Sequence, residues 1–166
     1  MARPLSSSLK FALVEDVTDA DIAFIAQGAQ KPVSLSEPLL RQWLIQIADN
    51  HHTRISRLYY YLCDDATIHQ LNAQHLQHDY PTDILTFPYS YHPIEAEIFL
   101  GVEEIARNAR DWNVSFEIEF LRVVAHGLLH MLGYSDTTDG ERTKMRSAED
   151  AALKLWQEHF NGLKSP

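Results

Sequence analysis

The segment HGLLHMLGYSD constrains this chain more than any other, because it places two histidines four residues apart before a glycine and an aspartate. Residues four apart on an α-helix lie on one face, with about 5–6 Å between their Cβ atoms. The imidazoles of His126 and His130 can therefore reach one metal ion. Gly133 can end the helix in a left-handed conformation, and the returning chain would bring Asp136 close enough to act as a third ligand.

A ligand set of two histidines and one aspartate leaves the fourth position of a tetrahedral zinc ion open for water, as in catalytic zinc sites. The spacing HxxxHxxGxxD matches the extended zincin pattern, and it predicts that His126, His130 and Asp136 bind one divalent ion. We expect zinc, although nickel and other divalent metals share such ligands. Two histidines at this spacing, taken alone, more often belong to the packed end of a helix that binds no metal. If the turn after Gly133 were wider than expected, Asp139 or Glu141 could be the third ligand in place of Asp136.

The residue after the first histidine is Gly127, at the position where HExxH metallopeptidases carry the glutamate that acts as general base. A metal can still lower the pKa of its bound water towards about 7 without a neighbouring base, but the usual proton shuttle of a peptidase is missing. The motif therefore predicts a hydrolytic metal site and argues against an ordinary metallopeptidase. Leu128, Leu129 and Leu132 fall on another face of the helix, so we expect them to pack inward while the imidazoles face a cleft.

Hydrophobic periodicity predicts an α+β fold, in which a small mixed β-sheet is covered by helices, one of them the zincin-like helix with the histidines. The expected element order is β-α-β-α-β-β-α-α-α. Ser36 and Ser115 are the expected N-caps of the first and fourth helices. Strands are predicted at residues 9–16, 54–63, 82–90 and 96–101, the last two as a hairpin, and helices within 31–52 and at 64–75, 102–112, 115–132 and 137–160.

The length of 166 residues fits one domain, which we expect over residues 9–166 after a disordered lead-in at residues 1–8. The N-terminal segment lacks the apolar core of a signal peptide, and no apolar run approaches the roughly 18 residues of a membrane span. Cys63 is the only cysteine, which fits a reducing cytosol. These features predict a cytoplasmic protein with no membrane association.

The chain carries a formal net charge of −9. This charge argues against unaided, non-specific binding of nucleic acid, although a local basic cleft or a partner would still allow RNA to bind. The abundance of carboxylates suits a divalent cation.

Beyond the histidine motif, the sequence resembles the YbeY family of bacterial metal-dependent endoribonucleases, which act in ribosomal RNA maturation. HGLLHMLGY is similar to the family's signature, and LNAQHLQHDYPTDILTF, residues 71–87, is similar to its Leu-Asn and Pro-Thr-Asp-Val-Leu-Ser-Phe stretch. EIFLGVEEIARNA resembles its strand-then-helix segment, and Glu119, Met145 and Glu149 fall on positions of its pattern. The resemblance extends from about Leu9 to the C-terminus.

The resemblance implies cleavage of single-stranded RNA at the 3′ end of small-subunit ribosomal RNA, and a part in ribosome quality control. It also implies RNA, the ribosome and ribosomal proteins as partners, and His126, His130 and Asp136 as ligands of one zinc ion. Asp136 stands where the family's third ligand is a histidine, and a carboxylate remains a competent zinc ligand.

Leu76 stands where the family has an arginine, and this departure bears on catalysis. Cleavage of a phosphodiester needs positive charge near the scissile phosphate. Arg122 is the catalytic candidate, because it lies four residues before His126 on the same helix face. It could instead only pair with Glu119 or cover a surface.

Two further carboxylates are candidates for roles beside the ligands. Asp83 and Glu97 lie at the starts of the two hairpin strands, and Ala96 and Glu97 replace a Gly-Asp pair of the family. Either carboxylate could accept a hydrogen bond from a ligand imidazole and fix its tautomer. Residues at such positions more often form turns.

Two other functions stay open from the sequence. The chain could be a metal-dependent hydrolase of another substrate, such as a peptide, although Gly127 weighs against this. It could also be a non-catalytic, ribosome-associated factor whose structural metal only fixes residues 133–136 to the helix, and Leu76 favours this alternative. The sequence identifies neither the preferred RNA sequence nor the oligomeric state.

Overall fold

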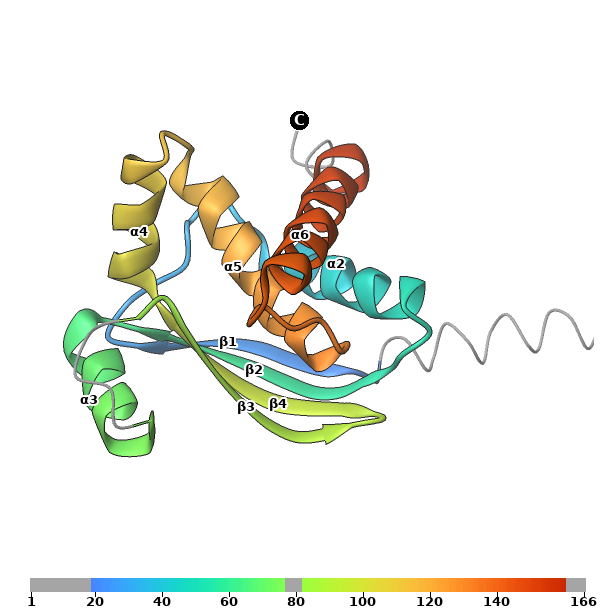
Figure 1. The fold of residues 1–166 in the computed structure, drawn as a ribbon, viewed down its shortest axis with the longest axis horizontal. Coiled ribbons are helices and arrows are strands. Elements are labelled where there is room, and N and C mark those ends of the chain that lie inside the picture. Colours follow the sequence, from blue (N-terminus) through green and yellow to red (C-terminus); the bar gives the residue numbers. More distant parts are fainter. Residues whose placement is uncertain (1–18, 77–81, 161–166) are drawn as a thin grey trace, which may run out of the picture.

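The computed structural model describes residues 19–76 and 82–160 (Figure 1). In these residues four strands form one mixed sheet and the helices pack around it, which confirms the predicted α+β class and, from the first predicted helix onward, the predicted element order. The elements are β1 (Asp21–Gln27), α2 (Glu37–Asn50), β2 (Ile55–Cys63), α3 (Asp65–Leu76), β3 (Ile84–Tyr91), β4 (Ile94–Gly101), α4 (Val102–Asp111), α5 (Phe116–Met131) and α6 (Asp139–His159).

The sheet has the strand order β1-β2-β4-β3. Strands β1, β2 and β4 run parallel, and β3 pairs with β4 in the antiparallel direction. In the central register Tyr60 lies beside Ile98, and Leu62 lies beside Leu100. All four side chains are buried, because alternate residues of a strand point to one face, and this face lies under α2 and α5 (Figure 1).

The opposite face of the sheet is covered at one end by α3. There Ile68 packs with Cys63 and Leu85 in a second, smaller cluster. Tyr61 and Phe99 stack beside them, with 4.8 Å between their ring centroids. The sheet therefore separates this cluster from the helix that carries the histidines.

Helix α5 lies at the centre of the larger core. Ser115 caps its first turn, because its hydroxyl accepts a hydrogen bond from the N–H of Ile118 at 3.1 Å, as predicted. Val124 and Leu128 are fully buried, and burial of each such side chain contributes roughly 1.5–3 kcal/mol. The hydroxyl of Tyr60 donates to the carbonyl of Val124 at 2.9 Å, which anchors the helix to the sheet.

The first strand is the element that periodicity did not find. The predicted strand at residues 9–16 and the predicted lead-in at residues 1–8 lie outside the described residues. Strand β1 occupies Asp21–Gln27, where no strand was predicted. Ile22 is its only buried side chain, so the segment DIAFIAQ lacks the strict alternation that marks a half-buried strand.

The predictions for the other elements are confirmed in type. The hairpin is formed by β3 and β4, which extend until only His92 and Pro93 separate them. Ser36 occupies the N-cap position of α2 as predicted, but its side chain makes no capping hydrogen bond. Within residues 19–76 and 82–160, no helix combines the length and apolarity needed to cross a membrane.

Candidate metal centre

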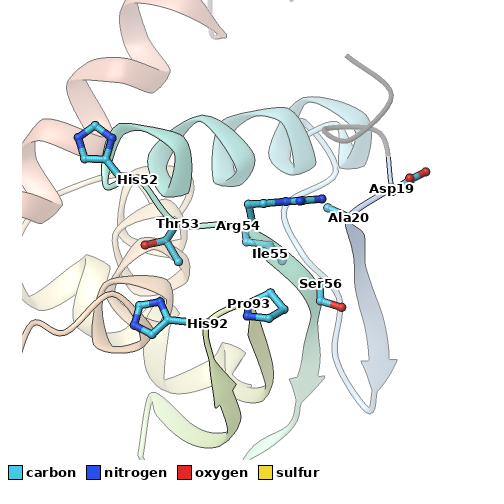
Figure 2. Close-up of a pocket in the computed structure, with 9 residues that line it drawn as sticks. All are labelled: Asp19, Ala20, His52, Thr53, Arg54, Ile55, Ser56, His92 and Pro93. Atoms are coloured by element: carbon cyan, nitrogen blue, oxygen red, sulfur yellow. The ribbon is translucent and has the colours of Figure 1, made fainter. Parts of the chain in front are cut away.

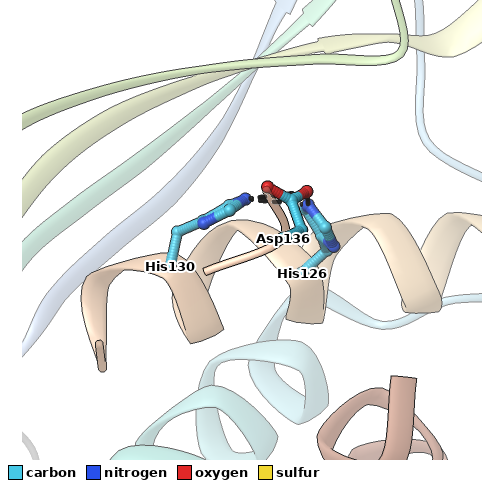
Figure 3. A group of neighbouring side chains, drawn as sticks. All are labelled: His126, His130 and Asp136. Atoms are coloured by element: carbon cyan, nitrogen blue, oxygen red, sulfur yellow. Dashed lines mark hydrogen bonds and ion pairs between the residues drawn. The ribbon is translucent and has the colours of Figure 1, made fainter. Parts of the chain in front are cut away.

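His126 and His130 lie one turn apart on α5, and their imidazoles point to the same side of the helix (Figure 3). Leu128 and Leu129 are fully buried and Leu132 packs against the same core, which confirms the predicted division of the helix into an apolar face and a histidine face. The side chains of His126 and His130 are 19% and 29% exposed, so a ligand can reach both rings from solvent.

Gly133 ends this helix in the left-handed conformation, with φ +101°. Its N–H donates to the carbonyl of His130 at 3.1 Å, and the N–H of Tyr134 donates to the carbonyl of Leu129 at 3.0 Å. These two bonds form the Schellman motif that commonly closes a helix at glycine. The turn reverses the chain and brings Asp136 over the two imidazoles (Figure 3).

Three atoms of the kinds that bind metals converge here. Nε2 of His126 and Nε2 of His130 lie 2.9 Å apart, and Oδ2 of Asp136 lies 3.4 Å from the former and 3.6 Å from the latter. A tetrahedral ion with bonds of about 2.0–2.1 Å keeps its ligand atoms about 3.3 Å apart. The three distances bracket this value, so the donor set fits one ion with one tetrahedral position left for a fourth ligand.

Hydrogen bonds hold both imidazoles in the tautomer that a metal ligand needs. Nδ1 of His126 lies 2.7 Å from Oε2 of Glu149, and Nδ1 of His130 lies 3.0 Å from the carbonyl oxygen of Tyr134. A carboxylate and a carbonyl only accept hydrogen bonds, so each Nδ1 carries a proton. When both rings are neutral, each presents its Nε2 lone pair to the other ring and to Asp136, and this convergence of acceptors suits a cation between them.

The charges around the site make a metal ion compete with a proton for His126. Burial alone would raise the pKa of Glu149 and lower that of His126, but the hydrogen bond between them and their mutual attraction outweigh burial, so the pKa of Glu149 is lowered and that of His126 is raised. Burial, followed by the neighbouring charge of His126, lowers the pKa of His130. Glu149 is therefore ionised, and its negative charge lies against the imidazole of His126, the ring that would also bind a metal ion.

The hydrogen-bond acceptors are not the two carboxylates suggested by the sequence. Asp83 lines the same cavity as His126, but neither ring donates to it, because each Nδ1 is bonded elsewhere. The suggestion for Glu97 is wrong. Its carboxylate accepts from the hydroxyls of Tyr61 at 2.8 Å and Tyr89 at 2.6 Å, on the sheet face that points away from α5.

Glu149 is the site residue that motif spacing did not reveal. It lies on α6, is 6% exposed, and belongs to the buried stripe that also contains Met145, Ala152 and Trp156. A carboxylate inside an apolar stripe signals a buried polar partner. The family resemblance marked this position without indicating that it bonds a histidine.

Arg122, the predicted catalytic candidate, lines the cavity beside His126, and its side chain is 18% exposed. Nη1 donates to Oε1 of Glu149 at 3.1 Å and to Oδ1 of Asp150 at 3.0 Å. The alternative pair with Glu119 also forms, but more loosely, with 3.9 Å from Nε to Oε1. Burial would lower the pKa of the guanidinium, but Asp150 and Glu149 raise it, so a fixed positive charge lies at the cavity.

The cavity beside the three converging residues has a volume of about 280 Å³ and carries both signs of charge. Its walls also include Arg146, Trp112, Asp83 and Glu119. Burial raises the pKa of Asp83, and it raises the pKa of Glu119 to about 7. Within the described part of the chain, Oε1 of Glu119 has no hydrogen-bond partner, so this carboxyl can take up or release a proton near neutral pH.

Gly127 occupies the position at which a peptidase carries its catalytic glutamate, and it also lies where α5 packs against the sheet. A Cβ placed here would lie 2.8 Å from Cδ1 of Ile98 and 3.1 Å from Cδ1 of Ile84. Helix α5 thus approaches the sheet so closely that a side chain fits only if these isoleucines shift. The glutamate of an HExxH motif would fit this position only if the ends of these two isoleucine side chains shifted.

A larger hollow, of about 460 Å³, lies beside the loop between α2 and β2 and the turn between β3 and β4 (Figure 2). Its lining includes His52, Arg54, His92 and Pro93, and none of the residues that the sequence suggests for catalysis or metal binding. The chemistry suggested by the sequence therefore belongs to the smaller cavity beside α5.

The fold and the site together define a class of protein. It is an α+β protein whose central helix presents two imidazoles to a carboxylate returned by a glycine turn, an arrangement suited to a metal-dependent hydrolase. The profile of the family described as endoribonuclease YbeY matches residues 25–157. The chain belongs to this family, which confirms the resemblance seen in the sequence.

Named relatives and a solved structure agree with this assignment. The endoribonuclease YbeY of Flavobacterium johnsoniae is 38% identical over 122 residues, which cover 73% of this chain and 88% of the relative. That of Cytophaga hutchinsonii is 42% identical over 118 residues, which cover 70% and 82%. The solution structure of TM1509 from Thermotoga maritima superposes with a TM-score of 0.61 at 28% identity, over 86% of this chain and 94% of the other.

Proposed function

We propose that this chain is a metal-dependent endoribonuclease that cleaves single-stranded RNA, acting on the 3′ end of small-subunit ribosomal RNA and in ribosome quality control. The observation that carries the proposal is the convergence of His126, His130 and Asp136 at ligand distances beside a cavity that holds a fixed arginine. Membership of the endoribonuclease YbeY family supports RNA as the substrate. The proposal includes a cytoplasmic location, with the ribosome and ribosomal proteins as partners.

The cofactor in this proposal is one zinc ion held by Nε2 of His126, Nε2 of His130 and Oδ2 of Asp136. Nitrogen and oxygen ligands of this kind also accept nickel and other divalent ions, so cellular availability decides between them. When bound, the ion would lower the pKa of a water molecule and polarise a phosphate oxygen.

The chain's own residues account for positioning and charge. Glu149 and the carbonyl of Tyr134 fix the orientation of the two ligand rings. Arg122 and Arg146 line the cavity, and in the proposal they bind the scissile phosphate and offset the charge that develops on it. Because Gly127 supplies no base, proton transfer falls to another carboxyl on the cavity wall, and Glu119, whose burial raises its pKa to about 7, suits this role.

A non-catalytic, ribosome-associated factor is the second candidate. The observation that favours it is the pairing of Arg122, whose guanidinium already contacts Glu149 and Asp150 and so has part of its charge neutralised before a phosphate arrives. The peptidase alternative has less support, because the position of its general base is closed by Ile98 and Ile84.

The deciding experiment compares wild type with His126→Ala and the matched control His159→Ala, in which an exposed histidine of α6 is removed. Zinc content is measured by elemental analysis, and cleavage of an unstructured RNA is measured with and without chelator. The proposal expects about one zinc per chain, chelator-sensitive cleavage, and loss of both only in His126→Ala. Zinc binding without cleavage, together with a lower melting temperature of His126→Ala, would instead support the non-catalytic factor.

A further inference from the structure

An exposed tryptophan, Trp112, lies on the rim of the cavity beside His126. Trp112 lines the cavity together with His126 and Asp136, and it is 55% exposed. The other two tryptophans, Trp43 and Trp156, are 0% and 2% exposed and pack against each other in the core. A large aromatic surface left open to solvent beside a reactive cavity is a common mark of ligand recognition.

Hydrogen bonds hold the main chain of Trp112 in place. The N–H of Trp112 donates to the carbonyl of Asn108 at 3.0 Å, and that of Val114 donates to the carbonyl of Ala109 at 3.0 Å. Between them, Asn113 adopts φ +55° and donates to the carbonyl of Arg110 at 3.2 Å. Trp112 is thus fixed in a hydrogen-bonded turn between α4 and α5, and its placement at the cavity is built into the helix connection.

The surroundings indicate the chemistry of the ligand. An open aromatic face binds nucleobases by stacking, with about 1–3 kcal/mol for each base. Arg146 and Arg122 line the same cavity and suit a phosphate. An aromatic plane beside two arginines and three convergent metal-binding groups matches a nucleotide with its base, its phosphate and a site for bond cleavage.

We propose that Trp112 is a stacking subsite for an unpaired nucleobase next to the phosphodiester that the metal cavity holds. This inference rests on the proposed function and deepens it, because it gives a physical reason for a single-strand preference. In a duplex both faces of each base are covered by the neighbouring base pairs, so the base cannot stack on the indole unless the strand is open.

The arrangement of tryptophans makes this subsite measurable without catalysis. Since Trp43 and Trp156 are buried, quenching of tryptophan fluorescence by added RNA reports on Trp112. The probe is an unstructured RNA added to the full chain in chelator, so that the RNA stays intact. We expect saturable quenching by this RNA, much weaker quenching by a fully paired duplex of the same sequence, and no quenching in Trp112→Phe, although that variant still binds.

Kinetics of the zinc-loaded chain provide the second readout. Trp112→Ala should raise KM for unstructured RNA about tenfold or more, whereas Trp112→Phe, which keeps an aromatic face, should stay within about threefold of wild type. Val114→Ala is the matched control, because Val114 is a neighbouring apolar residue, 41% exposed, outside the cavity lining. It should leave KM unchanged.

An RNA that carries abasic nucleotides separates stacking from a merely structural effect. If the base is what Trp112 binds, wild type and Trp112→Ala should cleave this RNA with the same KM. Persistence of the full difference on abasic RNA would overturn the inference, as would a wild-type KM for Trp112→Ala on unstructured RNA. In either case RNA cleavage itself would stand. A wild-type chain that neither binds nor cleaves any RNA would instead overturn the proposed function, and this inference with it.

Discussion

His126 and Glu149 form a 2.7 Å hydrogen bond that ties α5 to α6 at the metal centre. The second carboxylate oxygen of Glu149 accepts from Arg122 at 3.1 Å, so one buried carboxylate orients both a ligand ring and the arginine proposed to contact the phosphate. A group that fixes a ligand in this way typically changes metal affinity by about 10–100-fold when it is replaced.

Glu149→Gln should therefore weaken zinc binding about 10–100-fold. The amide keeps the shape of the side chain but removes the charge that favours the ring as a ligand. Affinity is measured by competition with a chromophoric chelator. Asp150→Asn is the control, because Asp150 also pairs with Arg122 but does not contact a ligand imidazole, and it should retain wild-type affinity. Equal losses in the two variants would show that Arg122, not the His126 contact, sets the affinity.

Substitutions of Asp136 test the third ligand. Asp136→His should keep one zinc per chain, because imidazole is an equally good ligand. Asp136→Ala should lose most of the zinc, and Asp136→Asn should fall between them, since a carboxylate both donates an oxygen and offsets the charge of the ion. Elemental analysis after dialysis gives the stoichiometry.

The neighbouring carboxylates serve as controls for that series. Asp139 pairs with Arg142, and Glu141 completes the capping box of α6 with Thr138, so neither is free to replace the ligand without disturbing the helix start. Asp139→Ala should keep its zinc. A full equivalent of zinc in Asp136→Ala, combined with its loss in Asp139→Ala or in Glu141→Ala, would move the third ligand to one of these residues.

Gly133→Ala should destabilise the chain by roughly 1 kcal/mol or more, because alanine is strained at φ +101°. A Cβ at Gly133 would meet no atom within 4 Å, so the cost is one of backbone conformation alone. Gly140→Ala is the matched control: it also has open space, but it lies in the first turn of α6, where alanine is tolerated and is favoured by less than the roughly 1 kcal/mol of a helix interior. The urea midpoint should fall in Gly133→Ala and stay unchanged or rise slightly in Gly140→Ala, and zinc affinity should fall only in Gly133→Ala.

The sequence predicted what depends on local pattern and missed what depends on tertiary packing. Helix α5 was found because Ser115 caps it and Gly133 ends it, and both signals lie in the chain next to the helix. Glu97 was misplaced because the sheet's orientation decides which alternate residues face α5, and β4 turns Ala96 and Ile98 inward. The family resemblance marked Glu149, but its bond to His126 depends on the docking of α6 against α5, which no spacing in the sequence encodes.

The pH dependence of stability tests the buried carboxyl of Glu119. Burial raises its pKa from 4.5 to about 7, although Arg122 and Arg146 oppose the shift, and Asp83 and Glu149 add to it. The folded state thus prefers the protonated form. The stability that this group contributes is fully present below about pH 4.5 and is lost as the pH rises through about 7.

The metal-free wild type should accordingly lose stability, on the order of 3 kcal/mol from this group, between about pH 5 and about pH 8. Glu119→Gln cannot ionise and should lack this part of the decrease, so it should be the more stable protein at the higher pH. Urea denaturation in chelator at the two pH values measures the difference. Glu117→Gln, on the partly exposed first turn of α5, controls for loss of one carboxylate, and parallel pH profiles for Glu119→Gln and wild type would refute the expectation.

Gly127→Ala tests whether α5 is pressed against the sheet closely enough to exclude a peptidase-like base. The added methyl would lie 2.8 Å from Cδ1 of Ile98, and overpacking of this kind costs about 1–3 kcal/mol, against a gain of up to about 1 kcal/mol in helix propensity. Ile98→Val removes that Cδ1 and alone costs about 0.5–1.5 kcal/mol. In the double variant, Ile98→Val makes room for the methyl group of Gly127→Ala, so the free energy of unfolding should be close to that of wild type or higher, because the effects of contacting residues are not additive.

Urea denaturation of the two single variants and the double variant gives the coupling energy. If the two effects simply add, Ile98 does not limit the approach of the helix, and the absence of a glutamate at position 127 needs a reason other than space.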